Sequence, residues 1–262
     1  MSADIQETAT ADVELAGDGW RMRVQMTVPM GPTRLRYLLP MVQSFTNTMV
    51  DLTAKAVEEQ GEKISCKKGC GACCRQLVPL AETEARHIHE LVEQMPEPRR
   101  SEVRGRFADA CRRLAEAGVL RKLLGRDHWT DEEASPLGIE YFRAGVPCPF
   151  LEEESCSIYP DRPLACRQYL VTSLAENCAR PTPETVKCVP MPLKVWSAVA
   201  RCDELAPGVR TIRWVPLVLA LEWADAHREE PPPRPGPEFV HKLIENLTRR
   251  GVPVPIPSRG GK

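Results

Sequence analysis

Residues 66–74 of the chain read CKKGCGACC. Four thiols fall within these nine positions: Cys66, Cys70, Cys73 and Cys74. Two glycines flank Cys70, and glycine allows the left-handed backbone conformations that let several thiols converge on one point. Because the loop has hardly any apolar residue to bury, core packing does not explain it. Clustered cysteines in a reducing compartment more often bind metal than form disulfides, so the stretch predicts a metal-binding loop.

A second cysteine-bearing segment lies downstream. Residues 148–167 read CPFLEEESCSIYPDRPLACR, and Cys178 and Cys188 follow them. Their wide spacing says little by itself, but Pro149 stiffens the loop after Cys148, and Arg167 supplies a donor that offsets thiolate charge. The predicted ligands are Cys66, Cys70, Cys73, Cys74, Cys148, Cys156, Cys166 and Cys178. Cys188 competes with Cys178 for the last place.

Two further cysteines belong to a different class. Cys111 lies at helical spacing from Phe107 and Leu114, and Cys202 extends a stripe of valines. A free cysteine at such a position behaves as a small apolar residue. Both are predicted to pack in the core rather than to bind metal.

Composition narrows the class of protein. The chain has 262 residues, with 35 Lys and Arg against 36 Asp and Glu. This balance argues against a basic nucleic-acid surface and a polybasic membrane anchor, so neither nucleic acid nor membrane is an expected partner. The N-terminus has no apolar core of a signal peptide, and the longest apolar run, 214–223, is too short to span a bilayer. The expected location is the cytoplasm.

Hydrophobic periodicity predicts a mostly α fold. Helical spacing covers 33–59, 82–95, 99–124, 213–228 and 237–250, with short helices near 131–142 and 163–170. Residues 20–28 alternate as a strand, which allows one short N-terminal strand pair. We expect a single helical domain over 19–250 with its motif core at 60–190, its cysteine-rich loops joined by a metal centre. Residues 1–18 are expected to be a disordered leader and 251–262 a flexible tail.

Both cysteine segments together resemble a known family, the CxxCxxCC (YkgJ-like) cysteine-cluster proteins. The resemblance covers about residues 60–190 and includes flagellin lysine N-methylase, which is similar in this region. The second segment carries it through Cys148-Pro149-Phe150-Leu151 and through Cys156, Ile158, Tyr159, Arg162, Pro163, Cys166 and Arg167. The first spacing departs from the family pattern, with three residues instead of two between Cys66 and Cys70. Membership implies a zinc- or iron-chelating centre and no particular reaction.

The sequence predicts the ligands more closely than it predicts which metal they bind. Zinc favours closed sites of four thiolates, so eight cysteines would satisfy two such sites or one shared cluster. The adjacent Cys73 and Cys74 argue against one mononuclear zinc, because neighbouring side chains tend to point apart. Proline after a ligand, as in Cys148-Pro149, is typical of iron–sulfur proteins. We therefore favour an iron–sulfur cluster of the [4Fe–4S] kind, with zinc as the alternative.

Three functions other than a metal-binding module share some features with this sequence. Similarity to flagellin lysine N-methylase allows protein lysine methylation, although no glycine-rich methyl-donor motif follows a strand. A thiol or electron-transfer redox protein is a second possibility. The spacing from Cys66 through Cys70 to Cys73 matches radical S-adenosylmethionine enzymes, but those require alternating strands and helices that the sequence lacks. Whether the protein is an enzyme is left open by the sequence.

Overall fold

Helices make up about half of the chain, as predicted. The computed structural model describes residues 7–17, 20–124, 131–182, 184–203 and 212–248. Its α-helices are α1 (Leu35–Glu59), α2 (Glu82–Glu93), α3 (Arg99–Glu116), α4 (Leu120–Leu124), α5 (Asp131–Arg143), α6 (Leu164–Arg167), α7 (Val195–Asp203), α8 (Ala220–Ala226) and α9 (Gly236–Thr248). Within these described residues no helix combines the length and the apolar character needed to cross a membrane.

The strands form small antiparallel pairs. They are β1 (Thr8–Gly17) with β2 (Trp20–Pro29), β3 (Pro32–Thr33) with β8 (Arg234–Pro235), β4 (Pro79–Leu80) with β7 (Val215–Pro216), and β5 (Leu151–Glu152) with β6 (Ser155–Cys156). Three of the four pairs have strands of only two residues, so they fasten loops rather than build a sheet layer.

The N-terminal hairpin confirms the expected strand pair and corrects the expected leader. Residues 8–17 are strand β1 and not disordered, whereas residues 1–6 lie outside the described part. The acidic composition that suggested disorder is matched across the hairpin, where Glu14 pairs with Arg21 at 3.2 Å and Asp12 with Arg23 at 3.6 Å. Leu15 faces the core, and opposite charges on the exposed face favour this register.

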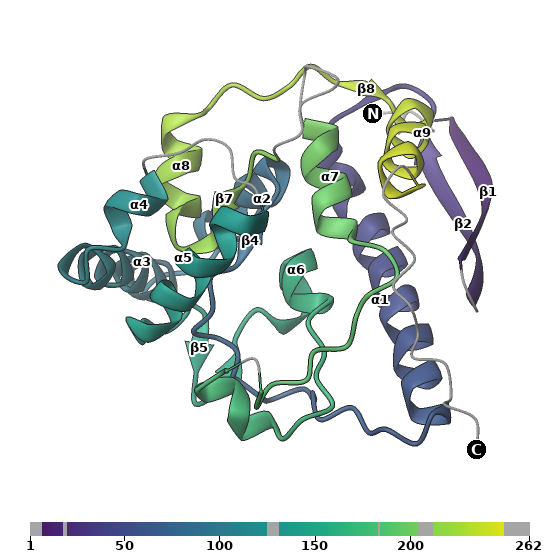
Figure 1. Cartoon of the computed structure of the whole chain (residues 1–262). Coiled ribbons are helices and arrows are strands. Elements are labelled where there is room, and N and C mark those ends of the chain that lie inside the picture. Colours follow the sequence, from purple (N-terminus) through teal and green to yellow (C-terminus); the bar gives the residue numbers. More distant parts are fainter. Residues whose placement is uncertain (1–6, 18–19, 125–130, 183, 204–211, 249–262) are drawn as a thin grey trace.

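Two hydrophobic clusters share the buried residues. The first includes Val92 of α2, Phe107 of α3 and Phe150, whose ring meets Phe107 edge to face at 5.4 Å between centroids. The second gathers β1, β2, α1, α7 and α9, with Val42 and Leu243 fully buried. Figure 1 shows α2, α3, α4 and α8 on the left, α1, α7, α9 and the hairpin on the right, and α6 between them.

Several element boundaries differ from the sequence prediction. The predicted helix 99–124 is two helices, because Gly118 adopts a left-handed φ of 73° between α3 and α4. Helix α7 was missed as an element, although its valine stripe was noted. The predicted helix from 213 is shortened to α8 by strand β7 and a 3-10 turn at Leu217–Leu219. The predicted tail 251–262 lies outside the described residues, and the assignment of 19–250 to one domain stays a prediction.

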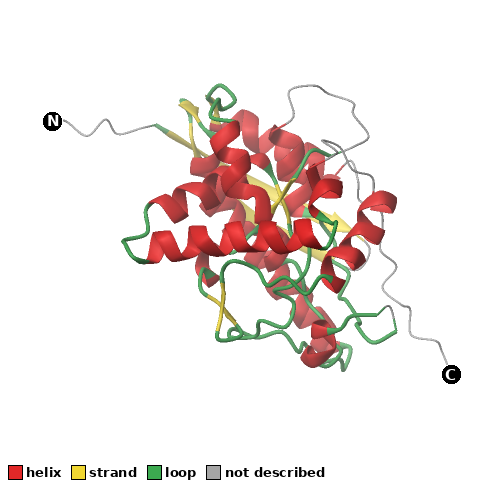
Figure 2. Cartoon of the chain, turned by 90° about the vertical axis from the view of Figure 1, so that its left-hand side faces the viewer, coloured by secondary structure: helices red, strands yellow, loops and turns green. Residues whose placement is uncertain are grey.

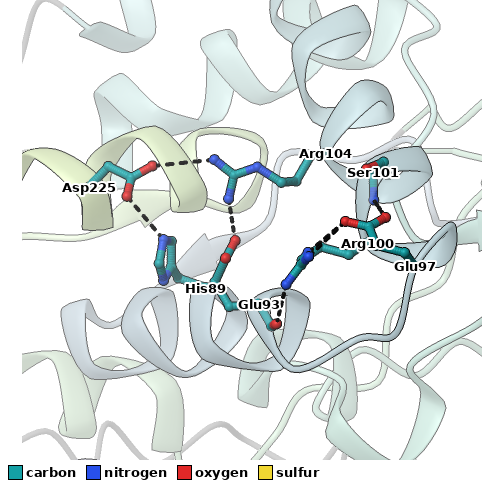
Figure 3. A network of polar contacts seen from close by, with 7 residues as sticks. All are labelled: His89, Glu93, Glu97, Arg100, Ser101, Arg104 and Asp225. Carbon is teal, nitrogen blue, oxygen red and sulfur yellow. Dashed lines mark hydrogen bonds and ion pairs between the residues drawn. The ribbon is translucent and has the colours of Figure 1, made fainter.

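A chain of charged side chains ties α2, α3 and α8 together at the surface (Figure 3). His89 of α2 contacts Asp225 of α8 at 3.1 Å, and Arg104 of α3 contacts the same carboxylate at 3.6 Å. Arg104 also pairs with Glu93. Exposed pairs of this kind contribute little individually, so the network orients three helices more than it stabilises them.

A buried carboxylate connects the helices to the second cysteine segment. Glu84 is only 4 % exposed, and its two oxygens accept hydrogen bonds from the backbone N–H of Leu164 at 2.8 Å and of Ala81 at 3.1 Å. These N–H groups open α6 and α2, where helices leave donors without partners. Asp203 of α7 caps α2 as well, accepting from the N–H of Thr83 at 3.0 Å. The Glu84 side chain thus holds α6 against α2.

Burial raises the pKa of Glu84 to about 7 from its ordinary 4.5. The folded chain therefore holds this proton more tightly than the unfolded chain, and the resulting stability is present below about pH 4.5 and lost as pH rises through about 7. We predict that the free energy of unfolding of the wild type, measured in urea, falls between pH 5 and pH 8. The fall should exceed that of Glu84→Gln by on the order of 2 kcal/mol. Glu82→Gln, on the same helix, should follow the wild type. Parallel pH profiles for all three proteins would contradict this role for Glu84.

Candidate metal centre

The first cysteine loop is a series of tight turns between α1 and β4. The N–H of Cys70 donates to the carbonyl of Lys67 at 3.2 Å, and that of Cys74 to the carbonyl of Gly71 at 2.9 Å. Gly69 has a φ of 87°, which glycine adopts without strain. Figure 2 shows many of the loop segments in the lower half of the molecule, with a short pair of yellow strands and some helical segments among them.

The β5–β6 hairpin docks on this loop. Glu153 and Glu154 form its turn with φ of 47° and 55°, as a two-residue hairpin requires. The backbone of Gly71 lies so close that a Cβ there would stand 2.5 Å from the carbonyl oxygen of Glu154. Arg75 fastens the contact through two hydrogen bonds to the Glu154 carboxylate, at 2.6 and 3.1 Å.

Four thiols gather on the hairpin side of the site. We call them the hairpin set: Cys73, Cys148, Cys156 and Cys166. The N–H of Cys148 donates to the carbonyl of Cys74 at 2.8 Å, which brings the two cysteine segments together. Cys156 lies on β6 opposite Leu151, and Cys166 lies on α6. Each of the three downstream thiols is within electrostatic range of Cys73.

Four other thiols gather around residues 169–172. We call them the bridge set: Cys66, Cys70, Cys178 and Cys188. The N–H of Ser65 donates to the carbonyl of Val171 at 2.9 Å, while Cys188 forms a β-bridge with Val171. The thiol of Cys66 lies 3.9 Å from the carbonyl oxygen of Tyr169. Cys178 and Cys188, the competitors for the last ligand position, thus lie in the same neighbourhood.

Cys73 interacts with thiols of both sets. Its electrostatic partners include Cys166 in the hairpin set and Cys66 and Cys178 in the bridge set. A hydrogen bond with the Cys74 thiol, followed by burial, raises the pKa of Cys73. The adjacent pair singled out in the sequence therefore stands where the two sets meet.

Burial shifts the pKa of five further thiols in one direction. It raises the pKa of Cys148 to about 12 and of Cys178 to about 11, and it raises the pKa of the Cys66, Cys156 and Cys166 thiols as well. Burying several thiolates without a compensating cation is costly, so these sulfurs favour the protonated form. A bound metal cation reverses this preference because it ligates the thiolate.

A half-buried cation, Arg162, stands beside these thiols. Arg162 lowers the pKa of Cys73 and of Cys156, and its guanidinium stacks over the ring of Tyr159 at 3.9 Å. Its Nε is buried and has no hydrogen-bond partner among the described residues. An orphaned donor next to thiols fits a site in which the sulfurs carry negative charge.

The thiols do not form a finished coordination shell. Across the described ranges, no three His, Cys, Asp or Glu side chains stand close enough together to hold a metal ion as they are placed. Ligation therefore requires the sulfur atoms to draw together. The donor set itself fits zinc or iron, since it is rich in sulfur and has an unsatisfied cationic donor beside it.

The remaining cysteines pack as expected for apolar residues. Cys111 and Cys202 are partly buried, against the first and the second hydrophobic cluster respectively. Each thiol lies near a backbone carbonyl, that of Val218 at 3.5 Å and that of Ala198 at 3.2 Å. Both therefore stand apart from the two thiol sets.

Comparison with known proteins finds a similar family in the region that holds the cysteines. The family model CxxCxxCC, described as a putative zinc- or iron-chelating domain, matches residues 65–188. Residues 65–188 are therefore similar to the CxxCxxCC family. The match begins beside Cys66 and ends at Cys188, so it spans both thiol sets. Neither the curated proteins nor the solved structures include a match.

Sequence reasoning missed several residues that shape the site. Glu152 pairs with Arg99 and Arg106 of α3, and Glu154 pairs with Arg75. Arg162 was noted only as part of the family pattern. The available signal was a triplet of acids between two cysteines, in a chain with a glycine-rich cysteine loop and an arginine-rich helix upstream.

The close approach at Gly71 gives a test of the docking. We predict that Gly71→Ala pushes the hairpin from the loop, destabilises the protein by about 1–3 kcal/mol and lowers its metal content. Gly105→Ala is the matched control, since nothing lies within 4 Å of its added Cβ on α3. It should be neutral or stabilising by up to about 1 kcal/mol. Equal unfolding midpoints and metal contents for both variants would contradict the docking.

Arg162 offers a test of charge compensation. We predict that Arg162→Gln weakens binding of the purified protein's metal by about 10- to 100-fold, because the sulfurs lose their cationic neighbour. Arg112→Gln, on the exposed side of α3, should leave the affinity unchanged. Competition with a chromophoric chelator measures both. An unchanged affinity in Arg162→Gln would remove this residue from the site.

Proposed function

We propose that the protein is a metal-binding protein whose cysteine cluster holds an iron–sulfur cluster. The ligands would come from Cys66, Cys70, Cys73, Cys74, Cys148, Cys156, Cys166 and Cys178. Zinc is the alternative occupant. The cluster would work in the cytoplasm, where thiols stay reduced; all eleven cysteines are free in the structure.

One observation carries this proposal: thiols from segments far apart in sequence surround Cys73. The hydrogen bond from Cys148 to Cys74 closes the intervening chain, and the bridge set adds thiols from residues 178 and 188. Core packing alone would place apolar side chains at such a junction. A metal-thiolate centre explains why sulfur is gathered there instead.

Four thiolates suit zinc and iron–sulfur clusters alike, so the choice between them depends on two other features. Arg162 offers a buried N–H donor beside Cys73 and Cys156, and hydrogen bonds to sulfur tune such clusters. Cys148 is followed by Pro149, as ligands in these proteins often are.

Anaerobic purification tests the occupant directly. We expect a brown protein with broad visible absorption, and iron with acid-labile sulfide in equal amounts on the same sample. A colourless protein with stoichiometric zinc would contradict the cluster and support the alternative. A protein free of both metals, after expression with each supplied, would contradict metal binding itself.

Substitution of single cysteines separates ligands from core residues. We predict that Cys73→Ser and Cys166→Ser each lose metal and stability, because metal binding contributes folding free energy directly. Cys111→Ser should keep its metal and lose only packing, at a cost of about 1 kcal/mol. Elemental analysis and thermal unfolding measure both effects. Equal metal content in the three variants would refute the assignment.

A further inference from the structure

Resting on the proposed function, we infer that the thiols form two separate four-sulfur sites, so that the chain binds two metal centres. The hairpin set makes one site and the bridge set makes the other. This inference revises the ligand set proposed above, because Cys188 takes the place of Cys74 as the eighth ligand. Four thiolates are the complement of a closed zinc site and of an iron–sulfur cluster alike.

The backbone keeps the hairpin set together. Cys148 precedes the hairpin and Cys156 lies on its second strand, and the N–H of Leu151 donates to the carbonyl of Cys148 at 2.9 Å. Cys166 lies on α6, whose first N–H group, that of Leu164, donates to the buried carboxylate of Glu84. Cys73 reaches this group because its loop is joined to Cys148 through the Cys74 carbonyl.

A different strip of backbone keeps the bridge set together. Residues 170–172 lie between two segments, taking a hydrogen bond from Ser65 on one side and exchanging hydrogen bonds with 187–189 on the other, at 2.8 to 3.0 Å. Cys66 and Cys188 therefore flank the same short strip. Tyr169 marks its start, with its carbonyl near the thiol of Cys66 and its side chain beside Cys188. Buried Cys178 lies on the 3-10 turn Ala175–Ala179, within electrostatic range of Cys66, Cys188 and Tyr169.

Cys73 and Cys74 sit at the boundary and take different roles. Cys73 interacts with all three other members of the hairpin set, which gives that set its fourth sulfur. The Cys74 side chain hydrogen-bonds with Cys73, and its carbonyl accepts from Cys148. Cys74 thus supports the loop by its contacts with Cys73 and Cys148. Without Cys188 the bridge set would have three thiols, so the completeness of this site depends on a cysteine at its exposed edge.

Loading is balanced by loss of protons. Each divalent ion that enters displaces one proton from each of four thiols, which leaves a site with a net charge of about −2. Two such sites close together repel, and the cation of Arg162 between Tyr159 and the hairpin set reduces that repulsion. No electron is transferred in this step.

Anaerobic titration of the metal-free, full-length chain with Co²⁺ tests the inference. Thiolate-to-cobalt charge-transfer absorption should rise linearly and stop at two Co²⁺ per chain. Cys188→Ser and Cys156→Ser should each stop at one, because each removes a ligand from one set only. Cys111→Ser is the control and should stop at two.

The outcomes separate this inference from the proposed function. Saturation of the wild-type chain at one Co²⁺ would overturn the two-site inference and leave metal binding intact. No charge-transfer band at any ratio would overturn both. Loss of both ions in Cys188→Ser, in a variant whose circular dichroism matches the wild type, would also overturn it, because it would make the sets one site. If a variant fails to fold, the number of Co²⁺ ions bound by the wild-type chain still tests the two-site inference.

Discussion

The region that bears the cysteines depends on one constraint: two polar loop segments must stay together between two hydrophobic clusters without a core of their own. The hydrogen bond from Cys148 to Cys74 closes about 74 residues of chain, and closing a loop of that length costs roughly 4 kcal/mol or more in entropy. A hydrogen bond returns only about 1 kcal/mol net. Metal-thiolate bonds contribute on the order of 10 kcal/mol in small zinc domains, which is more than this difference.

The clusters on either side determine where the thiols can meet. Phe150 packs in the first cluster directly after Cys148 and Pro149, while Leu164 packs in the second cluster two residues before Cys166. Cys148 and Cys166 are therefore each positioned by an apolar neighbour, and the two neighbours belong to different clusters. The Glu84 carboxylate holds α6 to α2 and so links these two positions. Loss of metal would loosen the contact between the clusters before it disturbs either one.

The helices and the cysteine motif were predictable from the sequence, because both are written in short-range spacing. Apolar residues three and four apart place α1, α2, α3 and α9, and the nine-residue loop announces a ligand cluster by density alone. Strand β1 was not predictable, since its acidic residues find their partners only across the hairpin. The two thiol sets depend on contacts between positions about 100 residues apart, such as Ser65 with Val171, and no local pattern encodes them.

X-ray absorption at the K-edge of the bound metal would show whether sulfur alone ligates it. We predict a first shell of sulfur at about 2.3 Å, the distance of a metal–thiolate bond. A first shell of nitrogen or oxygen at about 2.0–2.1 Å would contradict it, because it would place the metal on histidine or carboxylate side chains away from both thiol sets.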